Sequence, residues 1–217
     1  MSNIFLRDLS WNYISFFIIA FCGILINLII TKFSGISSLG IVNQVLAVYI
    51  LGAQVGMLGI SFSALHSISK KNRQIDYKLI ATAALIATIV PASLVSILIY
   101  LSSDYLSLIL ESDEVGSGIR LIAPGLFFFA LNKVSFAVIN GMRKMKVYAF
   151  FQTLRYVIIL LIISILLYKE VAASMLLLSF VASEVFLFII SIRFLYKQFI
   201  GVSFSFKQLM PHIKKHY

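Results

Sequence analysis

Six long apolar stretches fill almost all of this 217-residue chain, and they constrain its fold more than any other feature. Each is about as long as the roughly 20 residues that a helix needs to cross a bilayer. Only 12% of the residues are charged, whereas soluble domains carry about 25%. The pattern therefore predicts an all-α integral membrane protein with six transmembrane helices. The expected spans are 11–30, 39–62, 79–101, 118–139, 148–168 and 173–196.

The predicted spans leave little room for a soluble domain. Residues 1–199 are expected to form one six-helix transmembrane lobe, and residues 200–217 a cytoplasmic amphipathic tail or linker. The first span is long and is not followed by a small-residue cleavage site, so we interpret it as a retained signal anchor.

Lysine and arginine are distributed unevenly over the connections, which orients the chain. Thirteen lie in the N-terminus, the second and fourth connections and the C-terminal segment, against two, Lys32 and Lys169, in the other connections. Because cytoplasmic loops carry the excess of Lys and Arg, we expect both termini to be cytoplasmic. The thirteen are Arg7, Lys70, Lys71, Arg73, Lys78, Arg143, Lys144, Lys146, Arg193, Lys197, Lys207, Lys214 and Lys215.

Four charged residues lie inside the predicted spans, namely Arg120, Lys133, Arg155 and Glu184. Lys133 and Arg155 are each 11 residues from Lys144, the centre of the connection between their spans. In an antiparallel hairpin they lie at one depth, about 16 Å from the turn, and Glu184 lies within about 3 Å of that depth. The spacing predicts a layer of two cations and one anion inside the membrane.

The surplus positive charge of this layer has two interpretations, which stay open at this point. In the structural one, Arg155 and Glu184 form a buried ion pair, while Lys133 and Arg120 reach toward opposite membrane surfaces. In the functional one, the layer borders a hydrated cavity, where Arg155 clamps a phosphate-bearing substrate and Lys133 adds a point charge. The full set of candidate substrate-binding residues is Arg155, Lys133, Asn132, Gln152, Arg120, Asn43 and Gln54.

Two further features have a functional and a structural interpretation. Glu184 either pairs with Arg155, which is favoured, or binds a proton or Na⁺ and couples transport to an ion gradient. Gly52, Gly56 and Gly59 form a small-residue face in the second span. Such a face permits close helix packing, which is favoured over a sliding contact during transport.

Motifs for other chemistry are absent from the sequence. There is no P-loop, no metal-ligand spacing among His66, His212 and His216, and no Ser/His/Asp or paired-carboxylate arrangement. The single Cys22 allows no intrachain disulfide. We therefore expect a protein that is not an enzyme and that uses no cofactor and no metal. The basic residues flank apolar spans, which is a feature of membrane topology and does not indicate a nucleic-acid partner.

Two segments resemble bacterial polysaccharide-unit flippases of the multidrug/oligosaccharidyl-lipid/polysaccharide exporter superfamily. Residues 38–69 (SLGIVNQVLAVYILGAQVGMLGISFSALHSIS) are similar to the second helix and following loop of these proteins. Residues 131–161 (LNKVSFAVINGMRKMKVYAFFQTLRYVIILL) are similar to the hairpin of the fourth and fifth helices, above all at 140–145 and at Tyr148, Gln152 and Arg155. The likeness follows the same helix order over nearly the whole chain.

The resemblance implies a transporter of O-antigen, capsule or exopolysaccharide units, linked to undecaprenyl pyrophosphate, across the bacterial inner membrane. Members have two lobes around a central cavity and work by alternating access. By resemblance, Arg155, Gln152, Asn132 and Lys133 would line that cavity. The chain matches the N-terminal lobe alone, so a second lobe, from a separate chain or a homodimer, is an expected partner beside membrane lipids and the lipid-linked oligosaccharide.

Two alternatives to this flippase remain. A drug or ion exporter of the same superfamily would share the fold, although the excess of positive charge favours an anionic lipid over cationic drugs. A non-transporting membrane scaffold would need no surplus of buried charge. The sugar, the coupling ion and the oligomeric state are not specified by the sequence.

Overall fold

The computed structural model of the chain describes residues 2–70 and 77–199, and all regular structure in that part is helical, as predicted. The predicted tail, 200–217, lies outside the described residues. The elements are α1 (Ser2–Met57), α2 (Ile60–Ser69), α3 (Tyr77–Leu101), α4 (Ser103–Ile109), α5 (Asp113–Gly141), α6 (Met145–Tyr168), the 3₁₀ turn η1 (Ala173–Leu177) and α7 (Leu178–Phe199).

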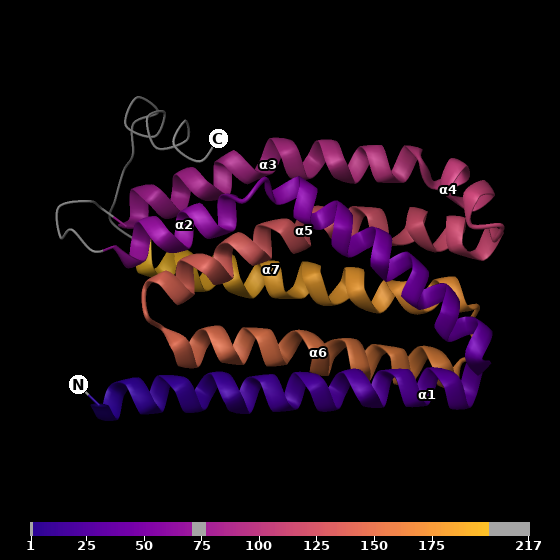
Figure 1. The fold of residues 1–217 in the computed structure, drawn as a ribbon, viewed down its shortest axis with the longest axis horizontal. Coiled ribbons are helices and arrows are strands. Elements are labelled where there is room, and N and C mark those ends of the chain that lie inside the picture. Colours follow the sequence, from indigo (N-terminus) through magenta and orange to yellow (C-terminus); the bar gives the residue numbers. More distant parts are fainter. Residues whose placement is uncertain (1, 71–76, 200–217) are drawn as a thin grey trace.

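The helix α1 is bent sharply at Gly35, where the sequence predicts a connection between two separate spans. Gly35 has φ 88° and ψ 168°, a combination that only glycine adopts readily. The first leg, residues 2–34, and the second leg, residues 36–57, are helical up to this residue on both sides, and the chain turns back there (Figure 1). The spans predicted at 11–30 and 39–62 are thus the two legs of one bent helix.

A second break, between α1 and α2, corrects the end of the span predicted at 39–62. Leu58 and Gly59 both have a positive φ, at 46° and 74°, so the second leg ends at Met57 and the ten-residue helix α2 starts at Ile60. Glycine adopts the left-handed conformation without steric cost, whereas leucine pays roughly 1 kcal/mol or more. Gly59 therefore terminates a helix and does not extend the predicted small-residue face.

The other spans match the predicted ones to within a few residues, except at the connection 102–117. That connection was expected to be a loop, but it contains α4 and the first turn of α5. Ser112 caps α5 by accepting a hydrogen bond from the Val115 amide at 3.4 Å, and Asp113 and Glu114 follow in the first turn. Both features favour a helix start.

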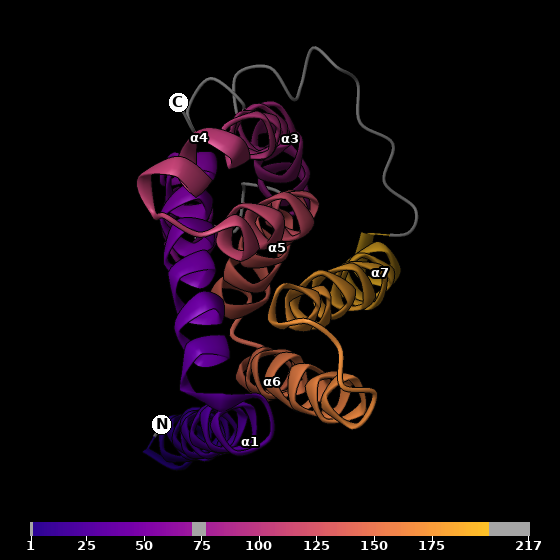
Figure 2. The same cartoon turned by 90° about the vertical axis from the view of Figure 1, so that its right-hand side faces the viewer.

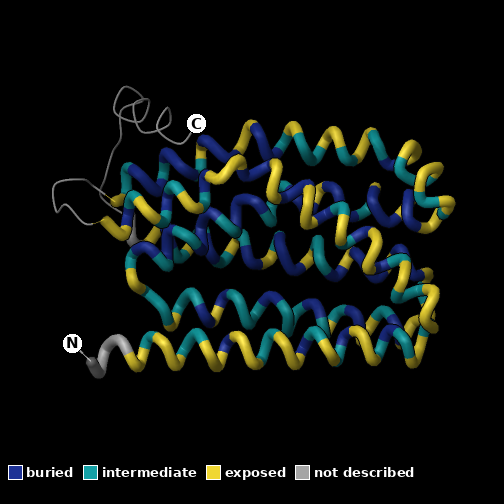
Figure 3. The backbone as a smooth tube through the Cα atoms, viewed as in Figure 1, coloured by how far each residue is buried: buried dark blue, intermediate teal, exposed yellow. Residues whose placement is uncertain are grey.

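The helix α5 lies at the centre of the bundle. Figure 2 shows it between α3, α7 and the second leg of α1, with α6 and the first leg on the remaining side. Its most apolar stretch is 67% buried, against 22–39% for the other long helices (Figure 3). Gly125 lets α7 come close, because a Cβ at this position would lie 3.0 Å from Val181 Cγ2. This contact places the polar residues of α5 beside those of α7.

The outer surface of the bundle is apolar, which is what a bilayer requires. Phe16 and Phe17 on the first leg are both 73% exposed, and large apolar side chains also cover the outer faces of α3 and α6. Among the described residues, five helices are long and apolar enough to cross a membrane. One of them is α1, whose legs of about 50 and 33 Å each exceed the roughly 30 Å of a hydrocarbon core. The chain is a membrane protein with one helical lobe.

The charged residues outside the spans gather at opposite ends of the bundle. The basic end carries the start of α1, the end of α2, the start of α3, the α5–α6 turn and the end of α7 (Figure 1). Its described cations include Arg7, Arg143, Lys146 and Arg193. The opposite end carries α4 and the turns that begin α5 and follow α6. This grouping is the one that the sequence predicts for the two sides of a membrane.

Candidate functional site: the buried charge layer

An ion pair between α6 and α7 lies in the interior of the lobe. Arg155 Nε is 2.8 Å from Glu184 Oε1, and Arg155 Nη2 donates a hydrogen bond to Glu184 Oε2 at 3.3 Å. Arg155 Nε–H makes no hydrogen bond, so the 2.8 Å contact between Nε and Oε1 is an ion pair only. The two side chains are 6% and 3% exposed. The structural interpretation of Arg155 and Glu184, a buried pair between two helices, is what the structure contains.

Asn132 of α5 brings a third helix to the same carboxylate. Its amide nitrogen donates to both the carbonyl oxygen and Oε2 of Glu184, each at 2.8 Å. Ser191 Oγ lies 3.2 Å from Asn132 Oδ1 and also 3.2 Å from Phe188 O, so its single proton has two acceptors available. Asn132 and Ser191 are fully buried. The carboxylate of Glu184 thus joins α5, α6 and α7.

Aromatic rings surround the two cations of the layer. The Arg155 guanidinium carbon lies 4.9 Å from the Phe129 ring centroid and 5.2 Å from that of Phe136. Lys133 Nζ lies 5.3 Å from the same Phe129 ring. Cations are attracted to ring faces at such distances. Because Lys133 and Arg155 share one ring and Arg155 touches Glu184, these residues lie at one level, as the loop counting predicts.

The charges of the layer do not balance. Glu184 is the only carboxylate beside Arg155 in the described part of the chain, and the Arg155 contacts and Asn132 already occupy its oxygens. Lys133 is half-buried and makes no ion pair within 4.0 Å among the described residues; its contact is the Phe129 ring. We call Asn132, Lys133, Arg155 and Glu184 the buried charge layer. Its net charge is positive, and the excess resides on Lys133.

Sequence reasoning missed part of this site. Phe129, Phe136 and Ser191 were not among the candidates, although spacing offered a signal for each. Phe129 lies four residues before Lys133 and Phe136 three after it, which places them on one face of a helix. Ser191 lies seven residues after Glu184, two turns along the same face. An apolar or hydroxyl side chain at such a position is ordinary packing until coordinates show what it touches.

The other candidate substrate-binding residues make no hydrogen bond or ion pair with the layer within the described part of the chain. Gln152 donates to the Tyr148 hydroxyl at 2.9 Å. Arg120 is paired with Asp104 and donates to Ser103 Oγ at 3.2 Å, next to α4. Asn43 and Gln54 are exposed on one face of the second leg of α1. The structure does not test whether any of them contacts a substrate.

The three glycines of the predicted small-residue face have two different roles: Gly52 and Gly56 allow close helix packing, and Gly59 lies at a helix break. A Cβ at Gly52 would lie 2.2 Å from Ile99 Cδ1 and 2.9 Å from Leu126 Cδ1, and one at Gly56 would lie 3.5 Å from Ala92 Cα. Gly52 and Gly56 thus pack the second leg closely against α3 and α5.

No group of three or more potential metal-ligating His, Cys, Asp or Glu side chains occurs within 2–70 and 77–199.

Comparisons with known proteins support the fold. No family model matches the chain, and no curated protein sequence matches it significantly. A solved structure described as "Crystal structure of MATE in complex with MaD5" is similar to it, with a TM-score of 0.68 and 12% sequence identity over 97% of this chain and 51% of that one. The chain spans about half the length of that protein. The likeness is one of fold, and it extends over nearly all of the helical lobe described above.

Proposed function

We propose that the chain is one lobe of an exporter that moves a lipid-linked oligosaccharide with an anionic pyrophosphate across a bacterial inner membrane. The observation that carries this proposal is the net positive charge of the buried charge layer. Glu184 is paired with Arg155 and Asn132, whereas Lys133 has only an aromatic partner among the described residues. An intramembrane cation without a counterion favours an anionic ligand.

Lys133 is the proposed contact to the pyrophosphate, and Arg155 keeps a supporting role. The Arg155 side chain is only 6% exposed and is enclosed by its carboxylate partner and two rings, so a substrate reaches it less easily than the half-buried Lys133. A lysine ammonium has three donors on a flexible stem and binds phosphate as a point charge. Glu184 orients Arg155 and is not proposed as the site of ion coupling.

The second leg of α1 supports the need for another lobe. Asn43 and Gln54 present amide groups on an exposed face inside a span, and an amide facing lipid costs several kcal/mol. A second lobe or the hydrated cavity between two lobes would satisfy them. Substrate sites of transporters built from two repeats lie at such an interface near the bilayer midplane. In this proposal both chain termini are cytoplasmic, and the substrate carries an O-antigen, capsule or exopolysaccharide unit.

A transport assay with three Lys133 variants tests the proposal. The chain, together with its second lobe where that is a separate chain, is reconstituted in proteoliposomes with a fluorescent polyprenyl-pyrophosphate oligosaccharide, and dithionite reports which leaflet holds the label. Lys133→Met should lower the transport rate at limiting substrate by roughly 10–100-fold, the loss of one charge-assisted contact. Lys133→Arg should retain more activity. The matched control is Lys169→Met, an exposed cation at the opposite end, which should leave the rate unchanged.

The second candidate function is a drug or ion exporter, and the fold likeness to a MATE favours it. In that case a cationic dye would be transported and the lipid-linked oligosaccharide would not. Lys133→Met would leave dye transport intact or increase it, because the variant removes a repulsive charge. Unchanged oligosaccharide transport by Lys133→Met would remove Lys133 from the proposed site.

A further inference from the structure

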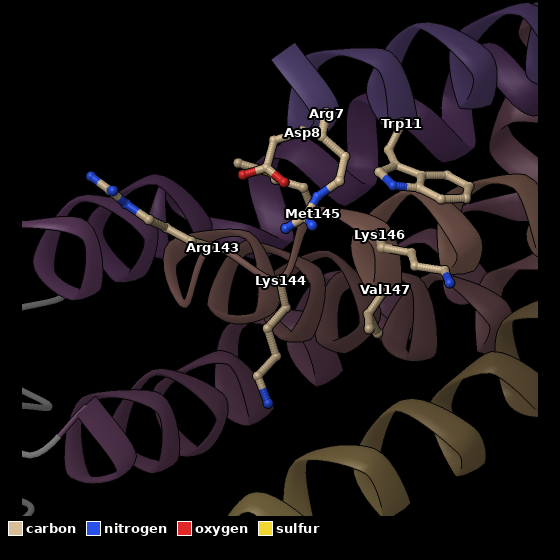
Figure 4. A pocket seen from close by; sticks show the side chains of 8 residues that line it. All are labelled: Arg7, Asp8, Trp11, Arg143, Lys144, Met145, Lys146 and Val147. Atoms are coloured by element: carbon tan, nitrogen blue, oxygen red, sulfur yellow. The ribbon is translucent and has the colours of Figure 1, made fainter. Parts of the chain in front are cut away.

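A pocket of about 430 Å³ lies at the basic end of the lobe, away from the buried charge layer. One wall is the start of α1, and the other is the α5–α6 turn with the first residues of α6 (Figure 4). Its polar lining consists of four cations and one carboxylate, with the single tryptophan of the chain beside them. These residues, which we call the basic pocket, are Arg7, Asp8, Trp11, Arg143, Lys144 and Lys146.

The basic pocket carries more cations than carboxylates, four against one. Asp8 makes no ion pair with Arg7, Arg143 or Lys146 in the described part of the chain, where the ion pairs are those of Arg120 and Arg155. The first turn of α6 also borders the pocket and has no side-chain cap, so the positive end of the helix dipole adds to the field. The pocket is therefore suited to an anion.

Trp11 indicates the depth of the basic pocket in the membrane. The Trp11 ring centroid lies 5.2 Å from Lys146 Nζ, and both side chains are drawn in Figure 4. Tryptophan is enriched at the boundary between headgroups and hydrocarbon. Ile14, three residues after Trp11 on α1, and Phe150, four residues after Lys146 on α6, are both exposed, and such spacings place them on the same helix faces as the pocket residues. The basic pocket thus opens where a charged end meets a lipid-facing apolar surface.

We propose that the basic pocket binds the phosphate headgroup of an anionic phospholipid. Basic pockets between transmembrane helices on the cytoplasmic side are suited to lipid phosphates, and the exposed side chains of Ile14 and Phe150 supply a surface for acyl chains. A free phosphate ion would gain nothing from that surface. Bound in this way, the lipid bridges the start of α1 and the α5–α6 turn. The proposal does not depend on what the lobe transports.

Trp11 makes the binding measurable, because it is the single tryptophan and lines the site. The full chain in detergent is titrated with dioctanoyl phosphatidylglycerol or dioctanoyl phosphatidylcholine while the tryptophan emission is recorded. We expect a saturable change with the anionic lipid and little with the zwitterionic one. Arg7→Gln, Arg143→Gln and Lys146→Gln should each weaken the binding about fivefold, the contribution of one basic residue near an anionic headgroup.

Two exposed cations of α7 at the same end, Arg193 and Lys197, supply matched controls outside the pocket. Arg193→Gln and Lys197→Gln should leave the affinity unchanged. Equal weakening by these controls would overturn the site, since it would mean that the whole basic end attracts anions. An equal response to phosphatidylcholine would overturn it as well. Inorganic phosphate acting at the same concentration as the anionic lipid would overturn the lipid as the ligand.

A second measurement needs no substitution and applies even if a variant fails to fold. The unaltered chain is placed in nanodiscs that contain a small share of phosphatidylglycerol or phosphatidylcholine with brominated acyl chains, which quench tryptophan at short range. Stronger quenching of Trp11 by the brominated anionic lipid is expected, and high salt should reduce the difference. Equal quenching by the two lipids contradicts the proposal.

Discussion

At the scale of single residues, the carboxylate of Glu184 is the common partner of the three helices around it. Breaking a buried ion pair by removing one partner costs about 3–5 kcal/mol, because the other charge is left without compensation. Removing both partners together can be nearly neutral. The pair is therefore expected to specify which faces of α6 and α7 meet, more than to add net stability.

Glu184→Gln is predicted to lower the free energy of unfolding by about 3–5 kcal/mol, since Arg155 stays charged in a buried site. The double variant Glu184→Leu with Arg155→Met should recover most of this loss. Thermal unfolding can be followed with a thiol-reactive dye at Cys22, which is buried in the folded chain and is the only cysteine. Additive effects of Glu184→Leu and Arg155→Met, each also measured singly, would contradict the coupling.

The residue scale also shows how far the sequence leads. Counting from the loop centres predicts that Lys133, Arg155 and Glu184 share a level, because helix rise is constant. The same counting cannot choose between a solvated cavity and a dry pair. That choice depends on side-chain contacts, such as the two hydrogen bonds from Asn132 that occupy Glu184, which no residue spacing specifies.

At the scale of elements, the bend of α1 determines how the first two spans pair. The first leg packs against α6, where Ser15 Oγ donates to Ala149 O at 3.1 Å, and the second leg packs against α5, where Tyr49 Oη donates to Gly125 O at 3.3 Å. Both contacts require the chain to turn back at Gly35.

Gly35→Ala is predicted to destabilise the lobe by about 1–3 kcal/mol, because an L-residue is strained at φ 88° and ψ 168°. Gly40→Ala, on the regular second leg, is the control. Its added methyl group meets nothing within 4 Å, and alanine is the better helix former. The thermal midpoint from the Cys22 assay should fall for the first variant and stay or rise for the second. Equal midpoints would mean that the bend relaxes.

Gly52→Val tests the close packing of the second leg. The new side chain would overlap Ile99 and Leu126, and overpacking of this kind costs typically 1–3 kcal/mol. Gly23→Val on the first leg is the matched control, since a Cβ there meets nothing within 4 Å. A lower thermal midpoint for Gly52→Val alone is expected, and similar midpoints for both variants would argue against the contact.

Element boundaries followed from the sequence where apolar runs end in polar residues, as at α3 and α6. The sequence did not predict the boundaries that are determined by unusual backbone dihedral angles. Leu58 carries a positive φ at a helix break, which its residue type disfavours. The α4 helix lies in a polar connection, and tertiary contact with α5 stabilises it.

At the scale of the whole molecule, the two ends differ in charge, and this predicts the orientation in the membrane. In a Cys22→Ser background, Lys70→Cys marks the basic end and Glu111→Cys the opposite end, and both positions are exposed. The excess of cations should face the cytoplasm. A membrane-impermeant maleimide added to intact cells, or to vesicles of the same orientation, should therefore label Glu111→Cys only. Labelling of Lys70→Cys from outside would reverse the topology.

The central helix, α5, has a consequence for biogenesis. Its best stretch has the lowest mean hydropathy of the five long helices, 1.7 against 2.2–2.6, and it is also the most enclosed. Lipid alone therefore holds this segment more weakly than its neighbours. We expect its stable residence in the bilayer to depend on the helices that pack around it, among them α7, which is synthesised after it.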